Sequence, residues 1–353
     1  MGIEMASHSA GIRTPRVRMK AQAPKVSVLV PSYNHGRYIQ ERIESIVNQT
    51  YANIELIVID DCSDDDSHSV ISELQARHGF RYLRNERNSG TPFAAWERIG
   101  ALASGDYIWV CESDDVAEPT FVETAVTNLL AEPDAVMFYS NSLIINEASQ
   151  IIGHTDSYFH DVWKESRWDA DFSADGIEEL LRYQLRGQIV PNMSSALFVA
   201  DAFRVAFTPF LKHLRLTGDW LFVGDVLKQG RVVFTHQALS RFRKHEVTSR
   251  VRVKSARSQA EFMLTKYRLF RASGQPVSAF ATLIGSDVIR FLYEPASWLD
   301  VGKALLQVAW LDTIKMACLL VASTLKNTTY INKFKDRYKH AKEWKTHEHK
   351  NHD

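Results

Sequence analysis

The stretch GDYIWVCESDD, residues 105–115, places a short apolar run directly before three carboxylates. Glu112, Asp114 and Asp115 fall within four positions, and carboxylates crowded this closely repel one another. Oxygen-rich clusters of this type suit a hard divalent cation that keeps positions open for substrate phosphates. The stretch therefore predicts a strand that ends in a metal and diphosphate site.

Apolar, β-branched runs alternate with helical patterns on either side of this stretch. Residues 25–30 and 54–59 are typical of buried parallel strands, and the spacing of isoleucines in 38–49 predicts a helix between them. The alternation continues with strands at 80–83, 107–110 and 135–139 and helices at 63–74, 91–102 and from 119. This order predicts an α/β fold with an open, mostly parallel sheet flanked by helices.

Polar clusters follow four of these strands, and open α/β sheets bind ligands outside the carboxyl ends of their strands. We therefore expect four loops to meet at one rim of the sheet. Neither a GxGxxG motif after the first strand nor a GxxxxGK[ST] motif occurs, which argues against a dinucleotide fold and a P-loop. The four clusters are residues 32–34, 60–61, 88–90 and 112–115.

Composition sets broad limits on the function. The 353 residues are 45% hydrophobic and 24% charged, as in an ordinary folded protein. Lysine plus arginine equals aspartate plus glutamate, 42 each, so no global field points to nucleic acid. Cys62, Cys111 and Cys318 form no CxxC pair, which argues against a zinc site and fits a reducing cytoplasm. No run approaches the roughly 20 apolar residues of a membrane span, so we expect a soluble or peripheral protein.

Together the blocks VSVLVPSYN (26–34), ELIVIDDCSDD (55–65), Asn88-Ser-Gly90 and 105–115 resemble the signature blocks of the inverting family 2 glycosyltransferases, which have the GT-A fold. The resemblance covers roughly residues 25–145. It implies a nucleotide-sugar donor, commonly a UDP-sugar, with Mn²⁺ or Mg²⁺ bridging the diphosphate. Such a cation stabilises the charge that develops on the leaving diphosphate.

The resemblance also implies roles for individual residues. Asp115 would hold the metal, with Asp114 facing the ribose and standing beside it as a second candidate ligand. Glu112 departs from the family's usual aspartate, and its longer side chain leaves its contact with the metal open. The nucleotide-binding residues implied are Pro31 and Tyr33 at the uracil, Asp61 bonding the base, and the loop residues Asn88 and Gly90, for which simple turn roles are the alternative.

Two motifs of the second half concern the acceptor side. Inverting transfer needs a base that removes the proton of the acceptor hydroxyl. Thr217-Gly218-Asp219-Trp220 resembles the family's later acidic motif, which gives the base role to Asp219; capping of the following helix is a compatible alternative. In the segment 242–250, His245 is a candidate ligand of the metal or diphosphate, and Arg243 and Arg250 are candidates for phosphate contacts.

These features predict a flexible leader (1–24), a GT-A domain (25–250) with a nucleotide-sugar half (25–145) and an acceptor half (146–250), a helical extension (251–326) and a basic polar tail (327–353). Interleaved aromatic and basic residues in the tail are typical of an interfacial segment, with a solvated helix as the alternative.

The predicted function is metal-dependent, inverting transfer of a sugar to a hydroxyl of a glycan or lipid-linked glycan, in surface polysaccharide biosynthesis. We expect it in the cytoplasm, with peripheral contact at the inner face of the plasma membrane. The alternatives are a nucleotidyltransferase and a catalytically silent sugar-nucleotide or glycan-binding module.

Overall fold

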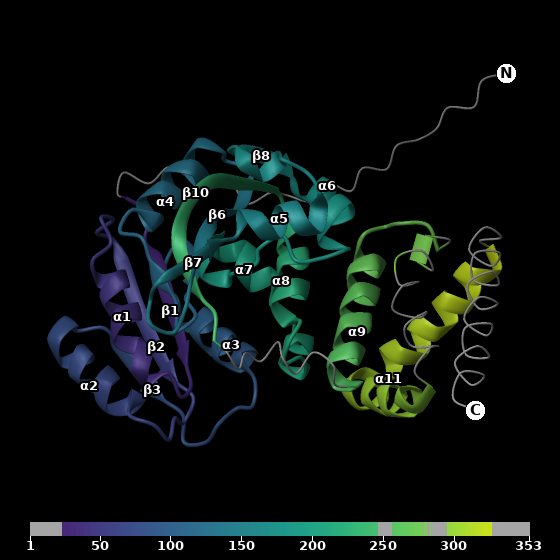
Figure 1. Cartoon of the computed structure of the whole chain (residues 1–353), viewed down its shortest axis with the longest axis horizontal. Helices are drawn as coiled ribbons and strands as arrows, with labels where there is room; N and C mark the ends of the chain where they lie inside the picture. Colours follow the sequence, from purple (N-terminus) through teal and green to yellow (C-terminus); the bar gives the residue numbers. More distant parts are fainter. Residues whose placement is uncertain (1–22, 246–255, 278, 281–282, 284–294, 327–353) are drawn as a thin grey trace, which may run out of the picture.

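A computed structural model describes residues 23–245, 256–277, 279–280, 283 and 295–326. A single curled sheet of ten strands organises the larger part of the molecule, with helices on both of its faces (Figure 1). Its main path runs β3-β2-β1-β4-β9-β6-β10-β5, with β7 paired to β6 and β8 paired to β10. The leader lies almost wholly outside the described residues, and the tail lies entirely outside them.

The first half of the chain supplies the parallel part of the sheet. Here β1 (Val26–Ser32) lies between β2 (Ile54–Asp60) and β4 (Tyr107–Val110), and β3 (Arg81–Arg84) pairs with β2. The predicted limits of β4 are confirmed, and the helix predicted at 91–102 is found over Pro92–Leu102. The connecting helices are α1 (Gly36–Val47), α2 (Ser67–His78) and α3 (Pro92–Leu102).

The first strand was predicted to end at residue 30, and this limit is wrong, because β1 continues through Pro31 to Ser32. The carbonyl of Ser32 accepts from the N–H of Asp61 toward β2, and the carbonyl of Leu29 accepts from Cys111 toward β4. Successive residues of a strand face opposite neighbours, so the Pro31 nitrogen points to the β4 side, beyond the point where β4 ends. Its missing N–H therefore breaks no bond of the sheet.

The second half makes the sheet mixed. The short strand β9 (Ala196–Val199) inserts antiparallel between β4 and β6, whereas β10 (Arg231–Arg243) runs parallel to β6 (Ala135–Ile145). The remaining strands are β5 (Val116–Ala117), β7 (Ile151–His154) and β8 (Phe172–Asp175). The helices are α4 (Phe121–Ala131), α5 (Asp156–Trp163), α6 (Gly176–Glu179), α7 (Ala200–Ala206) and α8 (Gly218–Leu227), with short turns at Arg167–Asp169, Leu180–Gln184, Met193–Ser195 and Pro209–His213.

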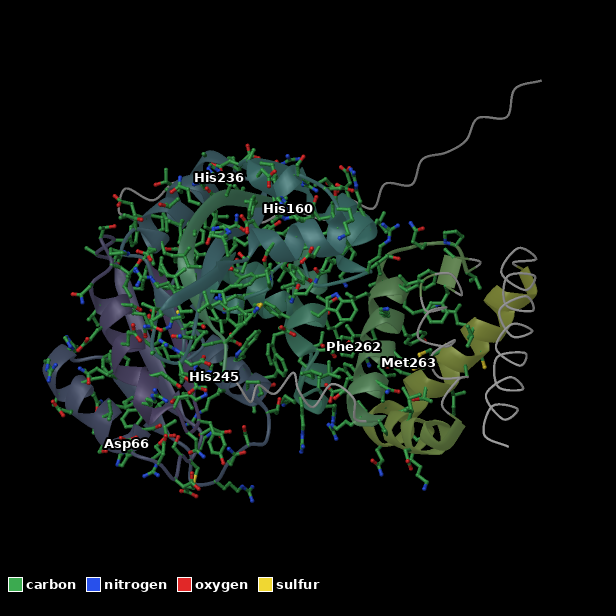
Figure 2. The ribbon with its side chains drawn as sticks, in the orientation of Figure 1. Asp66, His160, His236, His245, Phe262 and Met263 are labelled. Carbon is green, nitrogen blue, oxygen red and sulfur yellow. The ribbon has the colours of Figure 1, made fainter. Side chains whose placement is uncertain are left out.

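The helical extension packs on the sheet domain through α8, eight of whose ten residues are buried. Helix α9 (Ala256–Ala272) lies beside it, with the Phe262 ring 5.8 Å from that of Trp220, and Figure 2 shows Phe262 between the two helices. Helix α11 (Pro295–Lys326) then packs on α9, to which an ion pair between Arg268 and Asp312 ties it. In the described part of the chain, no helix is both long enough and apolar enough to cross a membrane.

Candidate active site

The loops that follow β1, β2, β3 and β4 are joined at one rim of the sheet. The N–H of Asn34 donates to Ser63 Oγ (2.9 Å), and Ser89 Oγ donates to Asp61 Oδ2 (2.7 Å). His35 Nδ1 and Ser113 Oγ are hydrogen-bonded at 2.7 Å. These contacts confirm the predicted meeting of four polar loops.

Three side chains on this rim form a candidate metal site. Ligand atoms of His35, Asp114 and His245 all lie within 4.8 Å of one another. Asp114 Oδ2 and His245 Nε2 are 2.7 Å apart, and the two imidazole rings stack with centroids 6.1 Å apart. Burial disfavours ionisation of Asp114, but the hydrogen bond from His245 and the two imidazoles outweigh it and hold its pKa below the usual value. The same hydrogen bond raises the pKa of His245.

The donor set fits a divalent cation. His35 is held through Nδ1 by Ser113, which leaves Nε2 available as a ligand atom. His245 directs Nε2 to Asp114 and Nδ1 toward Glu147 Oε1, 3.8 Å away, an outer carboxylate of the kind that orients metal-binding histidines. Two imidazoles and one carboxylate suit Mn²⁺ better than Mg²⁺, which prefers oxygen ligands.

Asp115 is not part of this cluster, although it was expected to hold the metal. It is 1% exposed, and its oxygens accept from Ser194 Oγ (2.7 Å) and from the N–H of Arg243 (2.9 Å). The structure thus brings Asp114 and His245 together and leaves Asp115 beneath the rim. Burial, followed by the charge of Asp114, raises the pKa of Asp115.

Asp61 belongs to a second group of contacts, with the loop after β3. Its carboxylate accepts from Asn85 Nδ2 (2.6 Å) and from the backbone and side chain of Ser89. Asn88 donates to the Asp61 carbonyl and accepts from the N–H of Gly90, whose φ of +78° favours glycine. Asn88 and Gly90 therefore shape the turn that brings Ser89 to Asp61.

The other two expected nucleotide residues lie at the end of β1. Pro31 is partly buried within the strand, and Tyr33 follows it with 47% of its surface exposed. An exposed ring beside the Asp61 loop is free to stack on a planar base.

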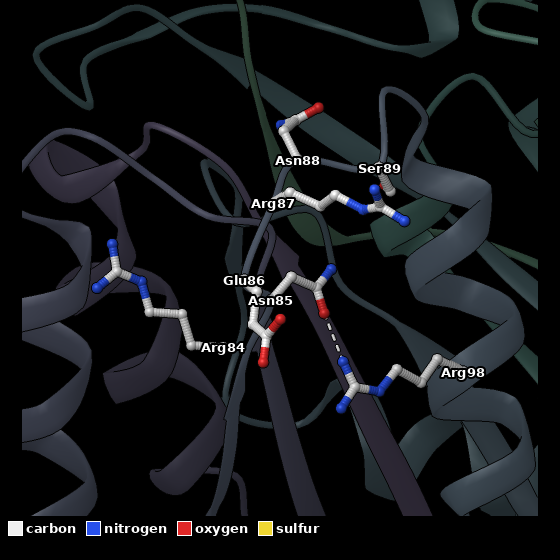
Figure 3. A pocket seen from close by; sticks show the side chains of 7 residues that line it. All are labelled: Arg84, Asn85, Glu86, Arg87, Asn88, Ser89 and Arg98. Carbon is white, nitrogen blue, oxygen red and sulfur yellow. Dashed lines mark hydrogen bonds between the residues drawn. The ribbon is translucent and has the colours of Figure 1, made fainter.

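A basic hollow of about 700 Å³ is lined in part by Asn85 and Ser89 (Figure 3), both of which donate to Asp61. Arg84 pairs with the buried Asp60 (3.1 Å), and Arg98 donates to Asn85, which in turn holds Asp61. The arginines of this hollow were not anticipated from the sequence, although Arg87 directly precedes Asn88 and Arg98 follows the turn. The hollow is lined by Arg84, Asn85, Glu86, Arg87, Asn88, Ser89 and Arg98.

Asp219 lies in the first turn of α8, where Thr217 occupies the N-cap. Its Oδ1 accepts from the N–H of Trp220 (2.8 Å). A Cβ on Gly218 would lie 2.4 Å from the Phe93 ring, so this glycine lets α8 start close against α3. Helix α3 itself follows the Asn88 turn in the chain. The backbone before Asp219 is also fixed by α9, where Glu261 Oε2 accepts from two successive N–H groups and Thr265 bonds Thr217.

The expected phosphate contact of Arg243 is wrong. Its side chain is fully buried, and each guanidinium nitrogen donates to protein. Arg250 lies outside the described residues. Sequence reasoning also missed His35 and Ser194. His35 directly follows the polar residues 32–34 after β1, a signal that was available, whereas Ser194 had none.

Comparison with known proteins agrees with this geometry. The sequence profile described as Glycosyl transferase family 2 matches residues 27–183. An uncharacterized glycosyltransferase of Haemophilus influenzae is 30% identical over 225 residues, covering 63% of this chain and 66% of the relative. The putative teichuronic acid biosynthesis glycosyltransferase TuaG of Bacillus subtilis is 31% identical over 142 residues, or 39% and 53% of the two chains. The chain thus spans less than two thirds of the length of these relatives.

Two solved structures share the fold. Residues 1–349 of Staphylococcus aureus TarS in complex with UDP superpose with a TM-score of 0.58 at 16% identity, covering 90% of this chain and 91% of that one. The mannosyltransferase PcManGT of Pyrobaculum calidifontis, in complex with GDP-Man and Mn²⁺, superposes with a TM-score of 0.52 at 16% identity. The match covers 88% of this chain and 83% of that one. The profile match thus places residues 27–183 of this chain in glycosyl transferase family 2, and the fold around them is GT-A-like.

Proposed function

We propose that the protein is a metal-dependent, inverting glycosyltransferase that takes a sugar from a nucleotide-sugar donor, with UDP as the expected nucleotide. The observation that carries this proposal is the cluster of His35, Asp114 and His245, which lies on the same rim of the sheet as the Asp61 loop. TarS was solved with UDP and PcManGT with GDP-Man and Mn²⁺, so the shared fold suits such a donor.

The metal in this proposal is held by His35, Asp114 and His245. It would neutralise charge on the leaving diphosphate, which makes protonation of the leaving group unnecessary. Glu147 would orient the His245 imidazole, and Ser113 would orient that of His35, each through the Nδ1 atom. Because two of the three donors are nitrogens, we expect Mn²⁺ to support activity better than Mg²⁺.

Donor recognition would rest on the loops after β1 and β3. The exposed Tyr33 ring offers a stacking surface, and the turn of Asn88 to Gly90 holds Ser89 against Asp61. Asp61 already accepts hydrogen bonds from Asn85 and Ser89, so we assign base selection to this linked group of three rather than to Asp61 alone. Arg87 and Arg98 in the adjoining hollow add positive charge beside the donor.

Asp219 is the proposed general base. Its carboxylate takes the proton of the acceptor hydroxyl while that oxygen forms a bond to the anomeric carbon. The bond from this carbon to the diphosphate breaks, and the nucleoside diphosphate leaves with the electron pair. Attack opposite the leaving group inverts the anomeric centre, so no covalent sugar–enzyme intermediate is needed.

A panel of nucleotides tests this function without knowledge of the acceptor. The melting temperature is measured with UDP, GDP and ADP, each with Mn²⁺, Mg²⁺ or EDTA, because a bound ligand stabilises the fold by mass action. We expect the largest increase with UDP and Mn²⁺, and loss of the metal effect in Asp114→Ala. If no nucleoside diphosphate shifts the melting temperature under any metal condition, the sugar-nucleotide function is refuted and a silent binding module replaces it.

The acceptor we propose is a hydroxyl of a glycan or lipid-linked glycan in surface polysaccharide biosynthesis, which the teichuronic acid assignment of TuaG supports. We further propose that the protein acts in the cytoplasm and that its tail, residues 327–353, touches the inner face of an anionic membrane. Lysines and arginines interleaved with aromatic residues in that segment support this contact.

A further inference from the structure

A buried set of hydrogen bonds from Ser194 holds the acidic motif, residues 112–115, next to the candidate metal site. Ser194 Oγ donates to Asp115 Oδ2 (2.7 Å) and accepts from the N–H of Glu112 (2.9 Å). One hydroxyl thus bridges the first and last residues of the four-residue acidic motif. The Ser194 carbonyl also accepts from Trp109 Nε1 (2.8 Å), so the bridge is itself anchored to β4.

Arg243 holds the same motif from the other side. Its backbone N–H donates to Asp115 Oδ1, and its Nε donates to the carbonyl of Asp114 (2.7 Å). Its Nη2 donates to Glu41 (2.7 Å) on α1, and Nη1 donates to Ser149 Oγ (2.9 Å) in the β6–β7 turn. The Arg243 guanidinium thus links the acidic motif to α1 and to the β6–β7 turn.

These contacts fix the backbone on both sides of Asp114 while its carboxylate turns to the histidines. Asp115 is 1% exposed, and each of its oxygens accepts a hydrogen bond from the protein, so its carboxylate is engaged beneath the rim. We propose that Asp115, Ser194 and Arg243 are positioning residues that aim Asp114 at a divalent cation, and that Asp115 is not a ligand. This inference rests on the proposed function and identifies which aspartate serves it.

Mn²⁺ binding provides a direct readout that does not require turnover. Free Mn²⁺ is followed by electron paramagnetic resonance while the ion is titrated into protein with UDP present. Residues that orient metal ligands typically contribute about 10- to 100-fold to metal affinity. We therefore expect Ser194→Ala to raise the Kd for Mn²⁺ by about tenfold or more.

Ser195→Ala is the matched control. Ser195 is adjacent and equally buried, but its hydroxyl donates only to the Asn192 carbonyl (2.7 Å). It should change the Kd by no more than about twofold at a similar loss of melting temperature. Equal Kd values for the two variants would overturn the inference, because Ser194 would then be a structural serine only.

Two aspartate variants separate ligand from positioning residue. Asp115→Asn keeps an acceptor for the Arg243 N–H, and its amide group can donate to the Ser194 hydroxyl in place of the oxygen that accepts from it. Asp114→Asn removes the charged ligand. Asp114→Asn should therefore weaken Mn²⁺ binding much more than Asp115→Asn, and the reverse order would contradict the inference. If the parent protein itself binds no Mn²⁺, the proposed function fails and this inference with it.

If Ser194→Ala does not fold, the Kd for Mn²⁺ is measured with Arg243→Lys instead. It retains the backbone bond to Asp115 but loses the Nε contact with Asp114. Arg241→Lys is its control, since Arg241 lies two residues earlier on β10 and pairs with Glu118 instead. A raised Kd in Arg243→Lys alone supports the inference, and equal Kd values in both variants refute it.

Discussion

Neighbouring residues of the acidic motif differ because their surroundings differ. Asp114 faces two imidazoles at the rim, and its pKa is lowered although burial opposes ionisation. Asp115 is enclosed, and burial raises its pKa. Two carboxylates side by side can thus take separate tasks, one facing a ligand and one bound within the protein.

At the same scale, Asp219→Asn should nearly abolish transfer while leaving nucleotide binding almost intact. The amide keeps the shape of the side chain but cannot take up the acceptor's proton, and loss of a general base costs roughly 10²- to 10⁴-fold in rate. Steady-state kinetics and calorimetry on the same variant check this. Asp225→Asn is the control on the same helix, where Asp225 pairs with Lys228 at 2.6 Å. A rate within threefold of the parent for Asp219→Asn would remove it from the mechanism.

The sequence identified several of the rim residues but neither His35 nor the orientation of the two aspartates. Alternation of strands and helices placed Asp61, Asn88 and Asp114 on neighbouring loops, because the carboxyl ends of parallel strands share an edge. Which of two adjacent aspartates faces outward depends on partners far away in the chain, namely Ser194 and Arg243. No local pattern carries that information.

Among the elements, α9 does more than cover α8. The Glu261 side chain is 1% exposed, and its carboxylate accepts from the N–H groups of Arg215 and Leu216 just before the Asp219 turn. Glu261→Ala would leave two N–H groups without that acceptor, at about 1–3 kcal/mol each. We expect a lower melting temperature and a reduced transfer rate, with Mn²⁺ binding unchanged.

Arg257→Ala is the control for this element, because it removes the half-exposed partner of Glu261, which also donates to the His213 carbonyl, but leaves the N–H groups of Arg215 and Leu216 with their acceptor. Such surface pairs contribute about 0–1 kcal/mol. Parallel thermal melts and initial rates compare the two variants. If Glu261→Ala lowers the melting temperature and the transfer rate no more than Arg257→Ala does, α9 has no part in placing Asp219. The composition of 251–326 predicted helices but not the contact of Glu261 with the backbone before Asp219. Glutamate is usually exposed, so the sequence gives no sign that this one is buried.

For the whole molecule, we expect the tail to add membrane affinity and nothing to the chemistry. Each lysine or arginine near an anionic surface contributes about 1 kcal/mol. Sedimentation with anionic vesicles compares the full chain with a chain that ends at Lys326. The full chain should pellet more at low salt and lose this advantage at high salt. Equal pelleting of the two chains at low salt would identify the tail as a solvated segment.

The antiparallel strand β9 has a consequence for how the protein folds. It fills the gap between β4 and β6, yet it follows β4 by more than 80 residues in the chain. A ribosome must therefore release residues 196–199 before the strand that carries the acidic motif gains its second neighbour. Closing so long a loop before its contacts form slows folding. The motif thus gains Ser194 only when that segment arrives together with β9, and Arg243 at the end of β10 follows later still.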